Sequence, residues 1–165
     1  SAALAAGMVG IAYAIFAIPS GLIAHRHGRK KTIRVALICI FTVLMLIFVH
    51  SVTFTGEGVS QMTRMIPFWA LMFLFGMFWV TVITNSFPML WQMADYSNMG
   101  IYTWLYYFFS QLASIIAPPI TGALIDLFGY GSLFVFAAAC MMVAFFLMSK
   151  VTRGEPHDDA KPLTA

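Results

Sequence analysis

The sequence predicts an all-α integral membrane protein with five transmembrane helices, and three observations support this fold class. Of the 165 residues, 61% are hydrophobic and only 9% are charged, whereas a soluble domain carries about 25% charged residues. Five apolar stretches reach the roughly 20 residues that a helix needs to cross the hydrocarbon core. Basic residues collect at the ends of these stretches. Because a spanning segment must satisfy its backbone hydrogen bonds internally, stretches this long and apolar favour helices over strands.

The first helix is expected over residues 2–24, where small residues recur. They are Gly7, Gly10, Ala14, Ala17 and Gly21. Small side chains at such spacing let a neighbouring backbone approach closely, so we interpret them as a packing face. The second helix, over residues 33–52, has little that is polar besides Thr42.

The third and fourth helices, over residues 67–93 and 101–125, each carry a polar stripe. On the third, with about 100° per residue, the polar or kinking positions share one arc: Thr81, Thr84, Asn85, Pro88, Gln92 and Asp95. On the fourth they are Thr103, Tyr107, Ser110, Gln111, Ser114, Pro118 and Thr121. Polar side chains are costly against lipid, so these stripes are expected to face protein or water. The fifth helix, over residues 132–149, is apolar up to Ser149.

The basic residues orient these helices. Eight of the nine lie near residues 26–34 or in the segment 150–161, and Arg64 alone lies between the second and third helices. By the positive-inside rule, the first connection, the third connection (94–100) and the C-terminus are expected to be cytoplasmic. We divide the chain into a transmembrane bundle, 1–153, and a cytoplasmic polar tail, 154–165. Because the sequence starts inside an apolar segment, we expect that the N-terminal part of a longer protein is missing from it.

A basic segment between the first two stretches brings a family resemblance. Its pattern resembles the Gly-x3-Asp-Arg-x-Gly-Arg-Arg/Lys loop of major facilitator superfamily transporters. The matching residues are Gly21, His25, Arg26, Gly28, Arg29 and Lys30. His25 stands where the family usually has Asp. Residues 100–126 are similar to the eleventh helix of glycoside–pentoside–hexuronide:cation symporters and sucrose-type carriers.

Two G-x6-G segments, 21–28 and 122–129, form a weak internal echo, with His25 aligned to Asp126. The two segments are expected on opposite sides of the membrane, as inverted repeats require. The resemblance then implies that the five helices are helices eight to twelve of a partial superfamily bundle whose N-terminal half is missing. In that fold the tenth helix lines the central cavity and the ninth and twelfth are peripheral. The polar third helix of this sequence fits the cavity-lining tenth helix. The apolar second and fifth helices fit the peripheral ninth and twelfth.

The candidate substrate path is built from the polar stripes. Asn85 and Gln111 are the strongest candidates because an amide offers several donors and acceptors to a hydroxylated solute. Tyr107, Thr84 and Gln92 are weaker members. The alternative is that the stripes of the third and fourth helices hydrogen-bond to each other.

The basic segment has two interpretations. In the family, the loop's Asp and Arg form a charged latch that stabilises one conformation. The resemblance implies this role for Arg26, Arg29 and Lys30, with Asp95 as the acidic partner. Because His25 supplies no permanent negative charge, such a latch is weaker or wired differently. Alternatively, these cations only set topology and touch anionic lipid.

The best-fitting function is that of a secondary active transporter, implied by the resemblance to be a cation-coupled symporter of a sugar or similar small polar solute. The coupling cation, a proton or sodium, is expected to bind in the missing half, since no acid lies at mid-membrane depth here. The expected location is a bacterial plasma (inner) membrane. The alternatives are a proton-coupled exporter of drugs or metabolites and a five-helix scaffold without transport.

Several other classes are excluded by the sequence. It has no HExxH motif, P-loop or nucleophile elbow, and no paired acids in a helix core. We therefore predict no enzyme, metal or cofactor. The positive charge collects at helix ends, which argues against a nucleic-acid partner.

Overall fold

The computed structural model describes residues 2–54 and 60–154, and this part of the chain folds into five helices. They are α1 (Ala2–His27), α2 (Arg29–Thr53), α3 (Gln61–Met93), α4 (Met99–Phe128) and α5 (Gly131–Lys150). Each expected span lies within one of these helices, and each helix is long and apolar enough to cross a membrane. The all-α fold is therefore confirmed. The expected tail, apart from Gly154, lies outside the described residues.

The basic connection between the first two helices differs from the expected loop. His25 and Arg26 lie in the last turn of α1, and Arg29 lies at the start of α2. Gly28 alone separates the two helices, with φ 90° and ψ 136°, a conformation that is nearly restricted to glycine. The expected loop was too long because a glycine turn ends α1 and permits α2 to start at once.

Gly129, the last residue of the second G-x6-G segment, has the same role as Gly28. Gly129 ends α4 with φ 82° and ψ 173°, and α5 begins two residues later. Both G-x6-G segments therefore end in a glycine turn between two long helices.

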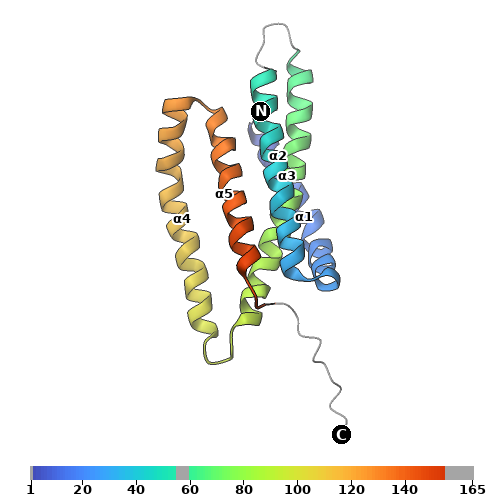
Figure 1. The fold of residues 1–165 in the computed structure, drawn as a ribbon. Helices are drawn as coiled ribbons and strands as arrows, with labels where there is room; N and C mark the ends of the chain where they lie inside the picture. The colour runs from blue at the N-terminus through green and yellow to red at the C-terminus, as the bar shows by residue number, and fades with distance from the viewer. Residues whose placement is uncertain (1, 55–59, 155–165) are drawn as a thin grey trace.

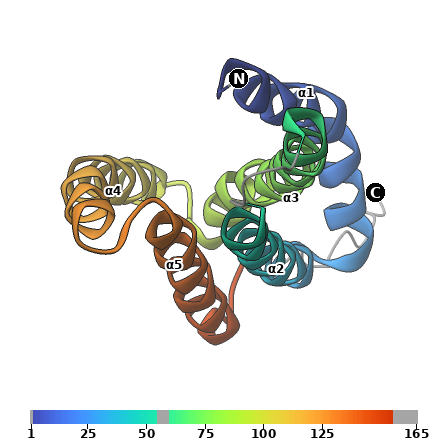
Figure 2. The ribbon, with the colours of Figure 1, turned by 90° about the horizontal axis from the view of Figure 1, so that it is seen from above.

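The helices pack around α2 and α3. Viewed from above, α3 lies between α1 and α2, α5 lies beside α2, and α4 is outermost (Figures 1 and 2). One face of α2 supplies most of the core, including Ile33, Leu37, Ile40 and Leu44. These side chains pack against α3 and α5, where Met89 and Ala138 are buried. The apolar second helix is thus the most buried of the five.

The backbones of α1 and α3 approach closely at Gly76. A β-carbon added to Gly76 would lie 2.9 Å from both the Val9 Cα and the Val9 carbonyl oxygen, and 3.0 Å from the Ala12 Cβ. A close approach of α1 to another helix is therefore present, but this contact with α3 does not use the expected glycines. Gly7 and Gly10 face open space, while Ala5 and Ala12 are buried. Several small residues on α1 left more than one possible face, and the glycine on α3 selects one of them.

The fourth helix is the least covered. It contains no buried residue in this structure and contacts α5 and the end of α3. Its apolar side chains, such as Phe109 and Ile115, are exposed. Such a surface is stable against lipid or against further protein.

We predict that Gly76→Ala destabilises the protein by about 1–3 kcal/mol, because the added methyl group overpacks the α1–α3 contact. The matched control is Gly7→Ala on α1, where the space is open; it should be neutral or stabilising by up to ~1 kcal/mol. Thermal unfolding of the purified protein in detergent measures both changes. Equal unfolding midpoints for the two variants would contradict the close approach.

Candidate functional site

One of the two strongest sequence-predicted site residues, Asn85, is buried between α3 and α1. Its side chain is only 2% exposed. The amide Nδ2 donates to the Thr81 carbonyl oxygen at 2.8 Å and lies 3.5 Å from the Ser20 carbonyl oxygen of α1. Asn85 therefore contributes to the contact between α1 and α3 in this conformation.

A pair of hydroxyls extends this contact. The Ser20 Oγ and the Thr84 Oγ1 lie 2.8 Å apart. Each also lies within hydrogen-bond distance of a carbonyl on its own helix, Ala17 for Ser20 and Val80 for Thr84. Because each hydroxyl has one hydrogen, one donates across the interface while the other donates to its own helix. We call Ser20, Thr84 and Asn85 the α1–α3 polar cluster.

Sequence reasoning missed Ser20. The residue lies among the small residues of α1, directly after Pro19, and it is 4% exposed. A single polar residue on an otherwise small and apolar helix face was the available signal. Its partners were not visible because they lie more than sixty positions away in the sequence.

The candidates on α4 lie apart from this cluster. Tyr107 and Gln111 are exposed, and Ser110 and Ser114 donate to carbonyls of their own helix. Gln92 is also exposed, near the end of α3. The structure therefore does not bring Asn85 and Gln111 together.

The two polar stripes also make little contact with each other. Within residues 60–154, the side-chain hydrogen bond found between α3 and α4 joins Trp91 Nε1 to Thr103 Oγ1 at 3.4 Å. Thr84 and Asn85 instead face α1. Thr84 and Asn85 thus bond in a direction that the sequence alone did not indicate.

The cations of the basic segment contact the end of α5. The Lys30 ammonium donates a hydrogen bond to the Val151 carbonyl oxygen, directly after α5. The Arg34 guanidinium lies 5.0 Å from the centre of the Phe145 ring, a cation–π distance. Gly154, with φ 92°, packs against Met89 and Met93 of α3. The start of α2 and the end of α5 are therefore joined on one side of the bundle.

The other members of the predicted latch are more open. His25 and Arg26 are exposed at the end of α1, and Asp95 is exposed just after α3. In the described ranges we find no ion pair of the Asp95 carboxylate. The pairing of these cations with Asp95 therefore stays a prediction.

The described residues contain no group of three or more histidine, cysteine, aspartate or glutamate side chains that could hold a metal ion. Cys39 and Cys140 are free thiols in α2 and α5.

Comparison with known proteins adds one match. The family model described as Major Facilitator Superfamily matches residues 1–165. No curated protein matches, and no solved structure matches.

We predict that Ser20 and Thr84 are energetically coupled. A double-mutant cycle with Ser20→Ala and Thr84→Val should give a coupling of about 0.6 kcal/mol in unfolding free energy, the average for polar contacts between membrane helices. The control cycle pairs Ser20→Ala with Ser86→Ala, because Ser86 donates to Val82 within α3. A coupling as large in the control cycle as in the first would contradict the contact.

Proposed function

Because the chain belongs to the Major Facilitator Superfamily, we propose that its five helices are the last five of a twelve-helix secondary transporter. We propose cation-coupled symport of a sugar or a similar small polar solute. In this proposal the Gly28 turn, the connection 94–98 and the chain end face the cytoplasm of a bacterium. The solute moves as one half of the bundle rocks against the other around a central site.

The polar stripe on α4 is the observation that carries this proposal. Tyr107, Ser110, Gln111 and Ser114 lie on a membrane-length helix whose residues are all at least partly exposed. A glutamine amide in the membrane interior is costly unless protein or water satisfies it. In this proposal, the other half of the transporter supplies the protein partners of this stripe, and a solute path between the two halves supplies the water.

Gln111 and Tyr107 are better placed than Asn85 to touch the solute. Their side chains are exposed, whereas the Asn85 amide is bonded within the α1–α3 contact. We therefore assign Asn85 and Thr84 to the wall that shapes the path, and Gln111 and Tyr107 to direct hydrogen bonding of solute hydroxyls. Gln92 lies toward the proposed cytoplasmic opening.

The coupling cation is proposed to bind in the other half. Intramembrane acids are the usual coupling groups. The acids of the described residues, Asp95 and Asp126, lie at the ends of α3 and α4. Neither position is at mid-membrane depth.

The basic segment is proposed to act as a conformational latch. Its cations include Lys30, which bonds to the end of α5 in the present conformation. Breaking this bond would free the α1–α2 corner to move relative to α5, and Arg26 or Arg29 would then be available to Asp95. The missing acid at position 25 is consistent with a latch that uses a backbone carbonyl.

We predict that Gln111→Ala lowers the initial rate of solute uptake about tenfold, as expected for the loss of one hydrogen bond of roughly 1.4 kcal/mol to the solute. The measurement is uptake of labelled sugars by vesicles under an imposed proton or sodium gradient. Cys140→Ala, on an exposed position of α5, is the control at matched abundance.

Unchanged uptake in both Gln111→Ala and Asn85→Ala would remove these residues from the path. Net efflux from preloaded vesicles would favour the exporter, since a symporter driven by the same gradient accumulates its solute.

We also predict that Lys30→Gln shifts the conformational equilibrium by about tenfold, because one charge-assisted hydrogen bond is lost. The readout is the maleimide labelling rate of Gln92→Cys in a background without Cys39 and Cys140. Lys150→Gln, which changes a cation at the end of α5, is the control. If labelling rates are equal with and without Lys30, the latch proposal is wrong.

A further inference from the structure

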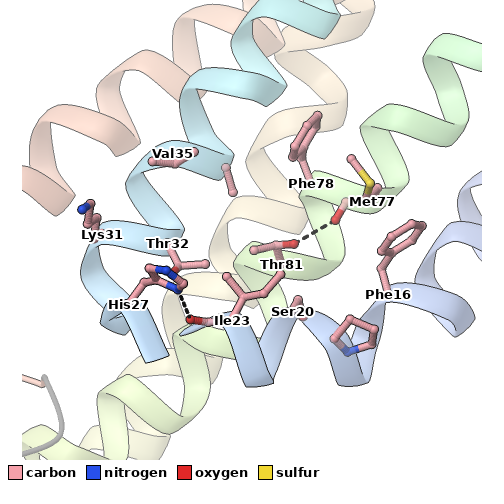
Figure 3. Close-up of a pocket in the computed structure, with 12 residues that line it drawn as sticks. Phe16, Ser20, Ile23, His27, Lys31, Thr32, Val35, Met77, Phe78 and Thr81 are labelled. Atoms are coloured by element: carbon pink, nitrogen blue, oxygen red, sulfur yellow. Dashed lines mark hydrogen bonds between the residues drawn. The ribbon is translucent and has the colours of Figure 1, made fainter. Parts of the chain in front are cut away.

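A groove lies between α1, α2 and α3, next to the Gly28 turn. Its volume is about 420 Å³, within the range of roughly 300–1,000 Å³ typical of ligand pockets. Figure 3 shows side chains from the three helices around it. One end is formed by Phe16, Met77 and Phe78, and the end beside the Gly28 turn by Ile23, His27 and Lys31.

The path of α1 explains why this space is open. Pro19 lies inside α1 and lines the groove. A proline in a helix interior removes one backbone hydrogen bond and kinks the helix, and Figure 2 shows α1 changing direction along its length. Because α1 packs on α3 rather than along α2, the two helices joined at Gly28 diverge and leave the groove between them.

The end of the groove near Gly28 is basic. The His27 Nδ1 lies 3.2 Å from the Ile23 carbonyl oxygen, so its Nε2 is directed away from the helix backbone. Lys31 is exposed at the start of α2, and we find no hydrogen bond or ion pair of its ammonium with a described residue. The Lys31 ammonium therefore places a cation at the mouth of an apolar groove, and the His27 ring beside it can donate from Nε2 to an anion only as the imidazolium, because Nδ1 is used by the Ile23 carbonyl.

We propose that this groove is a binding site for an anionic phospholipid from the leaflet that faces the Gly28 turn. One acyl chain lies against Phe16, Ile23 and Met77, and the phosphate lies between His27 and Lys31. The site joins an apolar channel to a cationic rim at the ends of two membrane-length helices, which matches the two parts of a lipid. A soluble anion would use the rim alone.

The headgroup sets the selectivity of this site. An acyl chain gains little by moving from the bilayer into the groove, because lipid tails are as apolar as the groove wall. Cations near the surface favour anionic over zwitterionic lipid. Phosphatidylglycerol is therefore expected to bind better than phosphatidylcholine with the same chains.

The site also adjoins the α1–α3 polar cluster. Ser20 and Thr81 line the groove. Ser20 contacts Thr84, and the Thr81 carbonyl accepts from Asn85. A bound chain would thus fill the space beside this contact and favour the conformation in which α1 and α3 are together.

The test is native mass spectrometry of the purified protein at its natural length, with phosphatidylglycerol or phosphatidylcholine of identical chains added to the micelles. We expect preferential retention of phosphatidylglycerol, reduced about fivefold by Lys31→Gln, the ratio expected for loss of one cation. Lys150→Gln, which removes an exposed cation outside the groove, should leave retention unchanged. Equal retention of the two lipids, or equal retention by Lys31→Gln and the unaltered protein, would overturn the site.

A second measurement locates the acyl chain. Phosphatidylglycerol with a diazirine at the end of one chain should label peptides that contain Phe16 or Met77. Val35→Trp, at an exposed position of the groove wall, should abolish this labelling while the Lys31 cation remains. Labelling confined to other helices, or none at these peptides because another protein segment covers the groove, would also overturn the proposal.

Discussion

The close approach of α1 to α3 at Gly76 is the contact on which the rest of the arrangement depends. With no side chain at Gly76, the backbones come near enough for Ser20 to reach Thr84 and Asn85. In a bilayer, where apolar side chains gain nothing by leaving lipid, close packing and hydrogen bonds between helices supply the specificity of association. Thr84 and Asn85 of α3 thereby find partners on α1 within the bundle.

The same contact determines what remains open. Because α1 packs along α3 and bends at Pro19, α1 and α2 diverge from the one-residue turn at Gly28 that joins them. The groove and the basic rim at its mouth both result from this divergence. On the other side of the bundle, α4 has no comparable partner, so its polar stripe is uncovered. One side of the chain thus suits a lipid, and the other suits the further helices of a transporter.

The glycine turns at Gly28 and Gly129 place the charged and polar helix ends. A longer connection would allow the cations at the start of α2 to move freely in water. The single-residue turn instead places Lys30 and Arg34 on a rigid helix, within reach of Val151 and Phe145. The basic segment therefore has a structural role in addition to any influence on topology.

The sequence by itself determined the five helices, their order and the family. Length and hydropathy suffice for this, because the bilayer permits few structures for long apolar segments. It also indicated the glycine ends of α1 and α4. It could not determine which face of α1 packs, because Gly7, Gly10, Ala5 and Ala12 are all small. Nor could it show that the Asn85 side chain points toward α1 instead of toward Gln111 on α4. Helical spacing gives the direction of a polar stripe only relative to its own helix. Only the tertiary structure decided which polar residues meet and where a groove remains. The α1–α3 contact at Gly76 sets which faces of these two helices meet, and the divergence of α1 from α2 at Gly28 leaves the groove.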